Sequence, residues 1–237
     1  MITVLSSDTS FPPLENAMTS PNGLLAVGGD LSVSRLINAY RSGIFPWFNE
    51  DEPILWWSPD PRMVLFPNEL KISRSLQKVL RKNHYTIRTD THFPEVMQFC
   101  AAPRKDQQGT WIHPEMMEAY NKLHRLGLAH SVETWINDEL VGGLYGIALG
   151  KIFFGESMFS RTPNASKIAF VHLVKQLTEW KYALIDCQVR TEHLASLGAR
   201  EISRKDFGQF LEQNIPDTTK GEKWDFSNLT GQSYENA

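Results

Sequence analysis

The segment GIFPWFNEDEPILWWSPDP, residues 43–61, constrains the fold more than any other feature of this sequence. It carries proline at positions 46, 53, 59 and 61. Because proline lacks an N–H and its ring clashes with helical backbone, this density excludes a regular helix. Five aromatic residues, at positions 45, 47, 48, 56 and 57, lie among the prolines. We therefore expect a rigid aromatic loop that packs on the following domain.

Composition indicates a globular protein of ordinary kind. The 237 residues are 41% hydrophobic and 22% charged, which is typical of soluble domains. No uncharged apolar run reaches the ~18 residues of a membrane span, and the first residues lack the basic and apolar regions of a signal peptide. Two cysteines, Cys100 and Cys187, cannot make a disulfide framework. We expect a cytoplasmic protein with no membrane partner.

Periodicity and capping residues predict a mixed α and β chain. Expected helices span 33–40, 74–82, 94–101, 114–126, 164–180, 191–197 and 204–213, with serines at 32, 73 and 203 as N-caps. Expected strands span 84–89, 131–136, 140–148, 152–155 and 183–190, and the polar last twenty or so residues are expected to be loose. The order strand–strand–strand–helix–strand from residue 131 onwards is that of GNAT-type acetyltransferase domains, so the predicted fold class is α+β, with a GNAT-like C-terminal domain.

The segment Ala183–Arg190 (ALIDCQVR) holds the first candidate functional residues. In a regular strand, alternate side chains share a face. Asp186 and Gln188 would then lie together, roughly 7 Å apart, with Cys187 on the core face as a small apolar residue. An acid beside an amide could orient an amine, although an ordinary polar strand face fits the same pattern.

Two further candidates are Glu156 and a basic helix face. Glu156 follows an apolar strand and Gly155, which permits close approach of a ligand, although a solvated strand-end turn explains it as well. Positions i, i+4 and i+7 of the helix that starts at Arg74 form a basic stripe (Arg74, Lys78, Arg81), and the segment from Lys71 to Lys82 contains no acid. Because the net charge is −3, any RNA binding must depend on such a local patch; a solvated helix face is the alternative. We expect no DNA partner.

The sequence does not contain the motifs of several common kinds of active site. The sequence has no GxxxxGK[ST] phosphate loop, HExxH zinc motif or GxSxG nucleophile elbow. Its histidines and cysteines show no metal-ligand spacing. We expect neither a metal nor a cofactor.

The sequence resembles the bacterial leucyl/phenylalanyl-tRNA–protein transferases from about residue 11 to residue 210. The resemblance is carried by PNGLLAVGGDLS, GIFPWF, PILWWSPDPR, GTWI, LVGGLYG, GESMFSR with NASK, IDCQV and HLASLGA. It implies a small N-terminal domain (1–61) and a GNAT-like catalytic domain (62–237). It also implies transfer of Leu or Phe, and less readily Met, from aminoacyl-tRNA to proteins with N-terminal Arg or Lys, which marks them for N-degron degradation.

The same resemblance implies roles for individual residues. Asp186, Gln188 and Glu156 would be the polar residues of the active site. Trp47 and Trp111 would hold the 3′-terminal adenosine, with Tyr40, Tyr120 and His193 as weaker candidates. The aminoacyl side chain would occupy a pocket lined by Leu144, Phe153, Met158, Phe170, Leu173 and Leu177. Our mechanistic hypothesis is that Asp186 polarises Gln188, which orients the attacking amine and helps to draw off its proton, while donors near Glu156 or the backbone stabilise the oxyanion. The alternative carrier of that proton is the 2′-hydroxyl of the terminal adenosine.

Two other functions remain open from the sequence. A CoA-dependent N-acyltransferase would share the fold, but its [QR]xxGx[GA] loop is replaced here by SRTPNASK, residues 160–167. A non-catalytic adaptor that binds tRNA or peptide would keep the basic stripe without needing Asp186 or Gln188.

Overall fold

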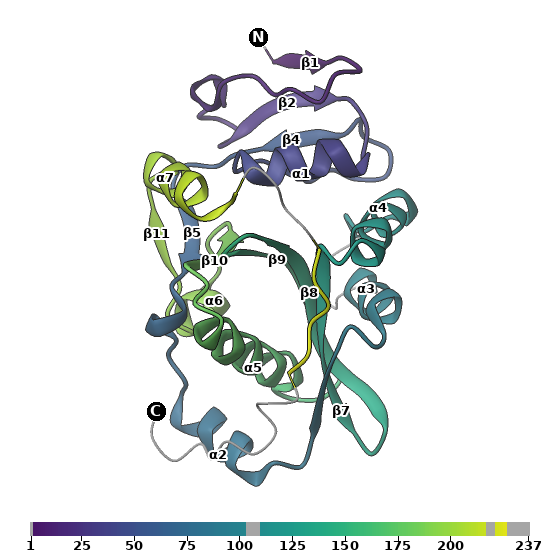
Figure 1. Ribbon diagram of the computed structural model, residues 1–237, viewed down its shortest axis with the longest axis vertical. Helices are drawn as coiled ribbons and strands as arrows, with labels where there is room; N and C mark the ends of the chain where they lie inside the picture. Colours follow the sequence, from purple (N-terminus) through teal and green to yellow (C-terminus); the bar gives the residue numbers. More distant parts are fainter. Residues whose placement is uncertain (1, 103–109, 217–220, 227–237) are drawn as a thin grey trace.

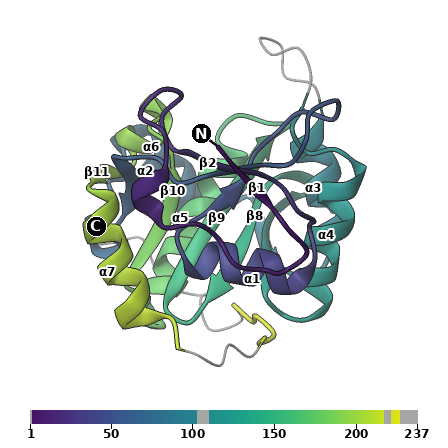
Figure 2. The ribbon, with the colours of Figure 1, turned by 90° about the horizontal axis from the view of Figure 1, so that it is seen from above.

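The computed structural model describes residues 2–102, 110–216 and 221–226. Within them the chain forms two β-sheets, one of four strands and one of seven. The small sheet lies at one end of the molecule, above the curved large sheet (Figure 1), and Figure 2 shows it from above. Leu36, Tyr40 and Trp56 of the small part belong to one hydrophobic cluster with Tyr120 and Phe154 of the large part.

The small sheet has the order β1-β2-β4-β3. Its strands are β1 (Thr3–Leu5), β2 (Leu24–Gly28), β3 (Phe45–Pro46) and β4 (Leu55–Trp57). Helix α1 (Val33–Arg41) packs against β3, and the 3₁₀ turn η1 (Leu14–Asn16) lies between β1 and β2 along the chain. The expectation of a loop over residues 43–61 is therefore wrong in part, because β3 and β4 pair antiparallel there. Proline is compatible with this arrangement because Pro46 lies in the edge strand β3 and Pro53 precedes β4.

The large sheet has the order β11-β5-β10-β9-β8-β7-β6. Strands β6 (Thr86–Thr89), β7 (Ala129–Ile136), β8 (Glu139–Leu149) and β9 (Ile152–Ser160) pair antiparallel in succession. Helix α5 (Ala165–Glu179) then crosses over, and β10 (Leu184–Gln188) pairs parallel to β9. This confirms the predicted α+β class and the strand–strand–strand–helix–strand order. Two strands that we did not predict, β5 (Arg62–Leu65) and β11 (Arg200–Ile202), extend the sheet beyond β10.

Helices cover both faces of the large sheet. Helix α5 packs within its curve, and α3 (Phe93–Ala101) and α4 (Pro114–Arg125) pack on the other face (Figure 1). The remaining elements are α2 (Arg74–Lys82), α6 (Glu192–Ser196), α7 (Arg204–Asn214) and the 3₁₀ turn η2 (Pro67–Glu69). The predicted serine caps are confirmed at all three positions, since each hydroxyl accepts an N–H three residues on.

The segment 221–226, which we call the C-terminal strap, lies across the molecule beside β8 (Figure 1). The strap contributes two buried aromatic residues, Trp224 and Phe226, which are 7% and 5% exposed. The expectation that the whole tail is loose is therefore wrong for these residues, because two aromatic side chains provide enough apolar area to hold a short segment in place. The rest of the predicted tail lies outside the described residues.

Candidate active site

The site lies where strands β9 and β10 separate. Their pairing ends at Phe154 opposite Asp186. Each strand then contains a β-bulge: in β9, Glu156 has no partner in β8, and in β10, Cys187 has none in β5. Bulges bend a strand and redirect its side chains. The two candidate acidic residues thus lie beside the point of divergence, where the sheet opens.

Asp186 is held by a residue that sequence analysis did not single out. Arg62, from β5, donates from Nε and Nη2 to the two carboxylate oxygens of Asp186 over 2.8 and 2.6 Å. Both side chains are buried, and the Arg62 guanidinium lies between the rings of Phe45 and Phe207. Its Nη1 also donates to the carbonyl of Gly43. The pair therefore ties the end of β10 to the small N-terminal part.

Gln188 is placed differently from the sequence expectation. Asp186 accepts a hydrogen bond from the backbone N–H of Gln188, at 3.0 Å, and the structure shows none between the two side chains. Gln188 has φ +56°, in the left-handed region, and the bulge pairs it with Met63 where Asp186 pairs with Val64. The predicted shared face is therefore wrong, because the bulge breaks the alternation of the strand. Val189, which a regular strand would place on the same face as Cys187, is 50% exposed.

The surroundings of Cys187 agree with the prediction that it is a small apolar residue on the core face. Its side chain is 8% exposed, and burial raises the pKa of the thiol well above its usual range, with Asp186 adding to the effect. A thiol that stays protonated is a poor nucleophile.

Glu156 accepts hydrogen bonds from two tyrosines. Tyr40 of α1 donates to its Oε1 at 2.7 Å, and Tyr120 of α4 donates to its Oε2 at 3.0 Å. The two hydroxyls also contact each other. Burial raises the pKa of Glu156 to about 7, against the lowering effect of both tyrosine hydrogen bonds. A carboxyl of this kind exchanges its proton near neutral pH.

A cavity of about 590 Å³ joins the polar residues to the apolar ones. Asp186, Gln188 and Glu156 line it, as do five of the six residues that we predicted for the aminoacyl pocket: Leu144, Phe153, Met158, Phe170 and Leu173. Leu177 does not line the cavity but is fully buried in the same hydrophobic cluster, behind it. The cavity is thus apolar along α5 and the middle of the sheet, and polar where β9 and β10 diverge.

Of the residues predicted to hold the adenosine, some line the cavity and others do not. Trp111 and His193 line the cavity, and the Nε2 atom of His193 has no hydrogen-bond partner among the described residues. Trp47 does not line it; it lies on the small sheet, half exposed, against Trp57. Tyr40 and Tyr120 are fully buried, so neither ring offers a free face for stacking, and their hydroxyls bind Glu156 instead.

The basic stripe lies apart from the small sheet. Arg74, Lys78 and Arg81 are exposed on α2, while Leu76 and Leu80 of the same helix are buried. Helix α2 is at the opposite end of the molecule from the small sheet (Figure 1). Within the described ranges, no ion pair involves any of the three stripe residues.

The described residues contain neither a metal-binding cluster nor a membrane-spanning helix. Among residues 2–102, 110–216 and 221–226, no group of three or more His, Cys, Asp or Glu side chains could hold a metal ion. No helix in the described part of the chain is both long and apolar enough to cross a membrane.

Arg62 and Tyr145 are residues of the site that were not predicted from the sequence. Tyr145 is fully buried, lines the cavity and has a hydroxyl without a hydrogen-bond partner among the described residues. Arg62 precedes the apolar segment MVLF, residues 63–66. An arginine at the start of such a segment, together with an aspartate inside an apolar strand, indicates a buried ion pair, because buried charges require partners.

Comparison with known proteins places most of the chain in one family. A model of leucyl/phenylalanyl-tRNA protein transferases matches residues 64–212, and a model of their N-terminal domain matches residues 29–60. The chain is 67% identical over 226 residues to the leucyl/phenylalanyl-tRNA–protein transferase of Nitrosospira multiformis, which covers 95% of this chain and 97% of the relative. It is 58% identical, over the same shares, to the corresponding protein of Chromobacterium violaceum.

Solved structures are similar at a more remote level. A GCN5-related N-acetyltransferase from Kribbella flavida is 11% identical, with a TM-score of 0.37 over 70% of this chain and 60% of that one. The L-PGS structure from Bacillus licheniformis is 12% identical, with a TM-score of 0.38 over 72% of this chain and 57% of that one.

Proposed function

The chain belongs to the leucyl/phenylalanyl-tRNA–protein transferase family, and from this premise we propose that it transfers Leu or Phe, and less readily Met, from aminoacyl-tRNA to the α-amine of proteins with N-terminal Arg or Lys. The product would carry a new N-terminal residue that marks it for N-degron degradation in the cytoplasm. The observation that supports this most is the cavity, which joins an apolar pocket to Glu156, Asp186 and Gln188.

The apolar part of the cavity would take the donor side chain. Leu144, Phe153 and Leu173 line it and offer no side-chain hydrogen-bond partner, so a large apolar side chain is favoured over a polar one. A branch at Cβ would place a methyl group beside the ester carbon. We therefore expect poor but measurable use of Ile-tRNA, since apolar pockets separate such shapes by only about 1–3 kcal/mol.

The polar part would position the attacking amine. In the reaction, the nitrogen of the acceptor amine forms a bond to the ester carbonyl carbon, the bond from that carbon to the 3′-oxygen of the terminal adenosine breaks, and the amine proton ends on that oxygen. Gln188 has an Nε2 atom without a hydrogen-bond partner among the described residues, which can donate to the ester carbonyl as negative charge develops there. Its Oε1 can accept from the amine.

Asp186 has a supporting role in this proposal. Its carboxylate is bonded to Arg62 and to the backbone N–H of Gln188, so it holds the bulge that aims Gln188 and does not polarise the amide side chain directly. Correct placement of reactants can supply about 7–11 kcal/mol of the barrier reduction. No covalent enzyme intermediate is required, because the donor ester is already activated.

Three parts of the protein would contact the tRNA. The Trp111 side chain at the cavity offers an aromatic face for the terminal base, and such stacking is worth about 1–3 kcal/mol. Trp47, exposed on the small sheet, would contribute a second ring. The stripe of Arg74, Lys78 and Arg81 would contact backbone phosphates without reading sequence.

The decisive experiment uses purified protein, radiolabelled Leu-tRNA and two acceptor proteins that differ only in their first residue, Arg or Glu. We expect label to pass to the Arg-initiated protein without CoA, and Gln188→Ala to reduce the rate strongly. A requirement for CoA would indicate an ordinary acyltransferase. Tight tRNA binding without any transfer would indicate an adaptor, and either result would overturn the proposal.

A further inference from the structure

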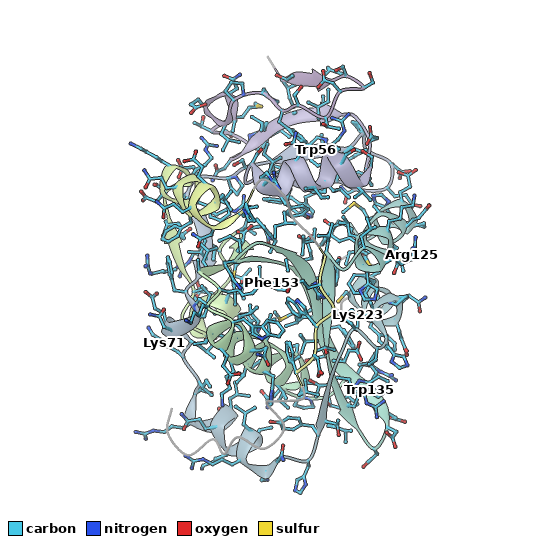
Figure 3. The ribbon with its side chains drawn as sticks, viewed as in Figure 1. Trp56, Lys71, Arg125, Trp135, Phe153 and Lys223 are labelled. Atoms are coloured by element: carbon cyan, nitrogen blue, oxygen red, sulfur yellow. The ribbon has the colours of Figure 1, made fainter. Side chains whose placement is uncertain are left out.

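The C-terminal strap packs against Phe153, one of the residues that line the cavity. The ring of Trp224 is 5.6 Å from that of Phe153, centroid to centroid, and Phe153 lines the cavity. Figure 3 shows Phe153 within the curve of the sheet and Lys223, next to Trp224 in sequence, on the strap beside β8. The strap thus reaches the cavity from behind, through one aromatic contact.

The strap is fitted to its position and does not merely lie on the surface. Trp224 stacks on His130 at 4.0 Å with an angle of 3° between the planes, and it contacts Trp180 edge to face at 5.4 Å. Glu222 donates its backbone N–H to the carbonyl of Gly127 at 3.0 Å. A Cβ atom on Gly221 would lie 1.7 Å from the carbonyl oxygen of Leu126, so only glycine fits at this crossing.

The strap also shares a hydrophobic cluster with the cavity wall. Trp224 and Phe226 belong to the same cluster as five cavity or near-cavity residues, namely Leu144, Phe153, Phe170, Leu173 and Leu177. Interiors are close-packed, so a side chain is held in place by what lies behind it. Without Trp224, Phe153 would have space to move away from the cavity. The family model ends at residue 212, before the strap begins.

We propose that the strap is a specificity-determining element: Trp224 supports Phe153 from behind and thereby sets the depth of the apolar pocket, and so the choice between Leu and Phe as donor. This inference rests on the proposed function, because it concerns the same cavity. Trp224 is a positioning residue in this view, since Phe153 lies between it and the donor side chain.

The test measures kcat/KM for Leu-tRNA and Phe-tRNA with Trp224→Ala. A deeper pocket penalises the larger side chain less, so we expect the Phe/Leu ratio of kcat/KM values to rise about three- to tenfold. One methylene group in an apolar pocket changes kcat/KM by about 10–200-fold, and the expected rise lies at or below the low end of that range. Indole, added to Trp224→Gly, should fill the vacated space and return the ratio toward the wild-type value. Should Trp224→Ala fail to fold, Trp224→Leu, which keeps part of the volume, is measured instead.

Trp135→Ala provides the matched control. Trp135 has the same 7% exposure as Trp224 but belongs to the other hydrophobic cluster, and Figure 3 places it well apart from Phe153. We expect both Trp135→Ala and Trp224→Ala to lower the melting temperature, but we expect Trp135→Ala to leave the Phe/Leu ratio unchanged. A ratio that is unchanged in both variants, or changed equally in both, would overturn the inference.

A binding measurement separates this inference from the proposed function. Equilibrium constants for 3′-leucylamido- and 3′-phenylalanylamido-adenosine report the pocket without any reaction. If wild type binds both but transfers neither amino acid, the proposed function fails, and the shift of the binding ratio in Trp224→Ala still decides the role of the strap. If wild type binds neither compound, both proposals are wrong.

Discussion

Replacing Arg62 by Met isolates the buried ion pair that holds Asp186. Met keeps most of the length and the apolar contacts between Phe45 and Phe207, but it removes the donors to both carboxylate oxygens of Asp186 and to the carbonyl of Gly43. A buried carboxylate then remains with the N–H of Gln188 as its only recorded donor within the described residues. Removing one partner of a buried pair costs about 3–5 kcal/mol of unfolding free energy.

A double variant tests whether the cost comes from the uncompensated charge. Arg62→Met with Asp186→Asn removes the charge as well, so we expect it to be more stable than Arg62→Met alone by about 1–3 kcal/mol. Arg200→Met is the control, since Arg200 of β11, in the same sheet, pairs with Glu69 of η2, but both side chains are exposed, at 51% and 39%. Exposed pairs contribute about 0–1 kcal/mol.

The assay is equilibrium unfolding in urea at pH 7, followed by circular dichroism. The free energies are compared among wild type, the two Arg62 variants and Arg200→Met, with a constant slope against urea as the check of two-state behaviour. If Arg62→Met loses no more than Arg200→Met, or if the double variant is less stable than Arg62→Met, then the ion pair does not hold this part of the sheet as argued.

Three further predictions concern the cavity and the basic stripe. Burial raises the pKa of Glu156 to about 7, so its protonated form stabilises the fold fully below about pH 4.5, and this stabilisation is lost as the pH rises through about 7. Relative to Glu156→Gln, the unfolding free energy of the wild type should therefore fall between pH 5 and pH 8. A difference between the two proteins that stays constant with pH would contradict the raised pKa. Leu173→Trp should reduce kcat/KM for Phe-tRNA more than for Leu-tRNA, because overfilling penalises the larger side chain first; an unchanged ratio would show that Leu173 is only a core residue. Replacing the three stripe residues, Arg74, Lys78 and Arg81, by Ala should weaken tRNA binding and flatten its salt dependence by roughly one unit per lost phosphate contact. Transfer from a short aminoacyl-adenosine should continue. A tRNA affinity equal to that of the wild type would show that the stripe is not part of the interface.

The elements with strong local signals could be predicted from the sequence. Helices α1, α2 and α7 begin after the serines that cap them, and α5 follows its apolar periodicity. The strands that failed prediction are short or lie among prolines, such as β3, with two residues, and β5, with four. Their pairing comes from distant partners, and a short segment carries too few residues to show a period of two.

For the candidate site, the identities of the residues could be predicted, but their contacts could not. The motifs IDCQ and GESMF drew attention to Asp186, Gln188 and Glu156, and the structure brings all three to one cavity. The expected alternation along β10 failed because the bulge after Asp186 depends on the divergence of β9 and β10, which is a property of the sheet.

Sequence by itself determined the elements with strong local signals, the polar and apolar residue types of the site and the family. Only the tertiary structure decided which groups meet: Arg62 reaches Asp186 across 124 residues, Tyr40 reaches Glu156 across 116, and Trp224 lies behind Phe153. The physical reason is that capping and periodicity act over one or two turns of chain, whereas a buried charge or aromatic ring takes the partners that the packed core brings to it, at any separation in sequence.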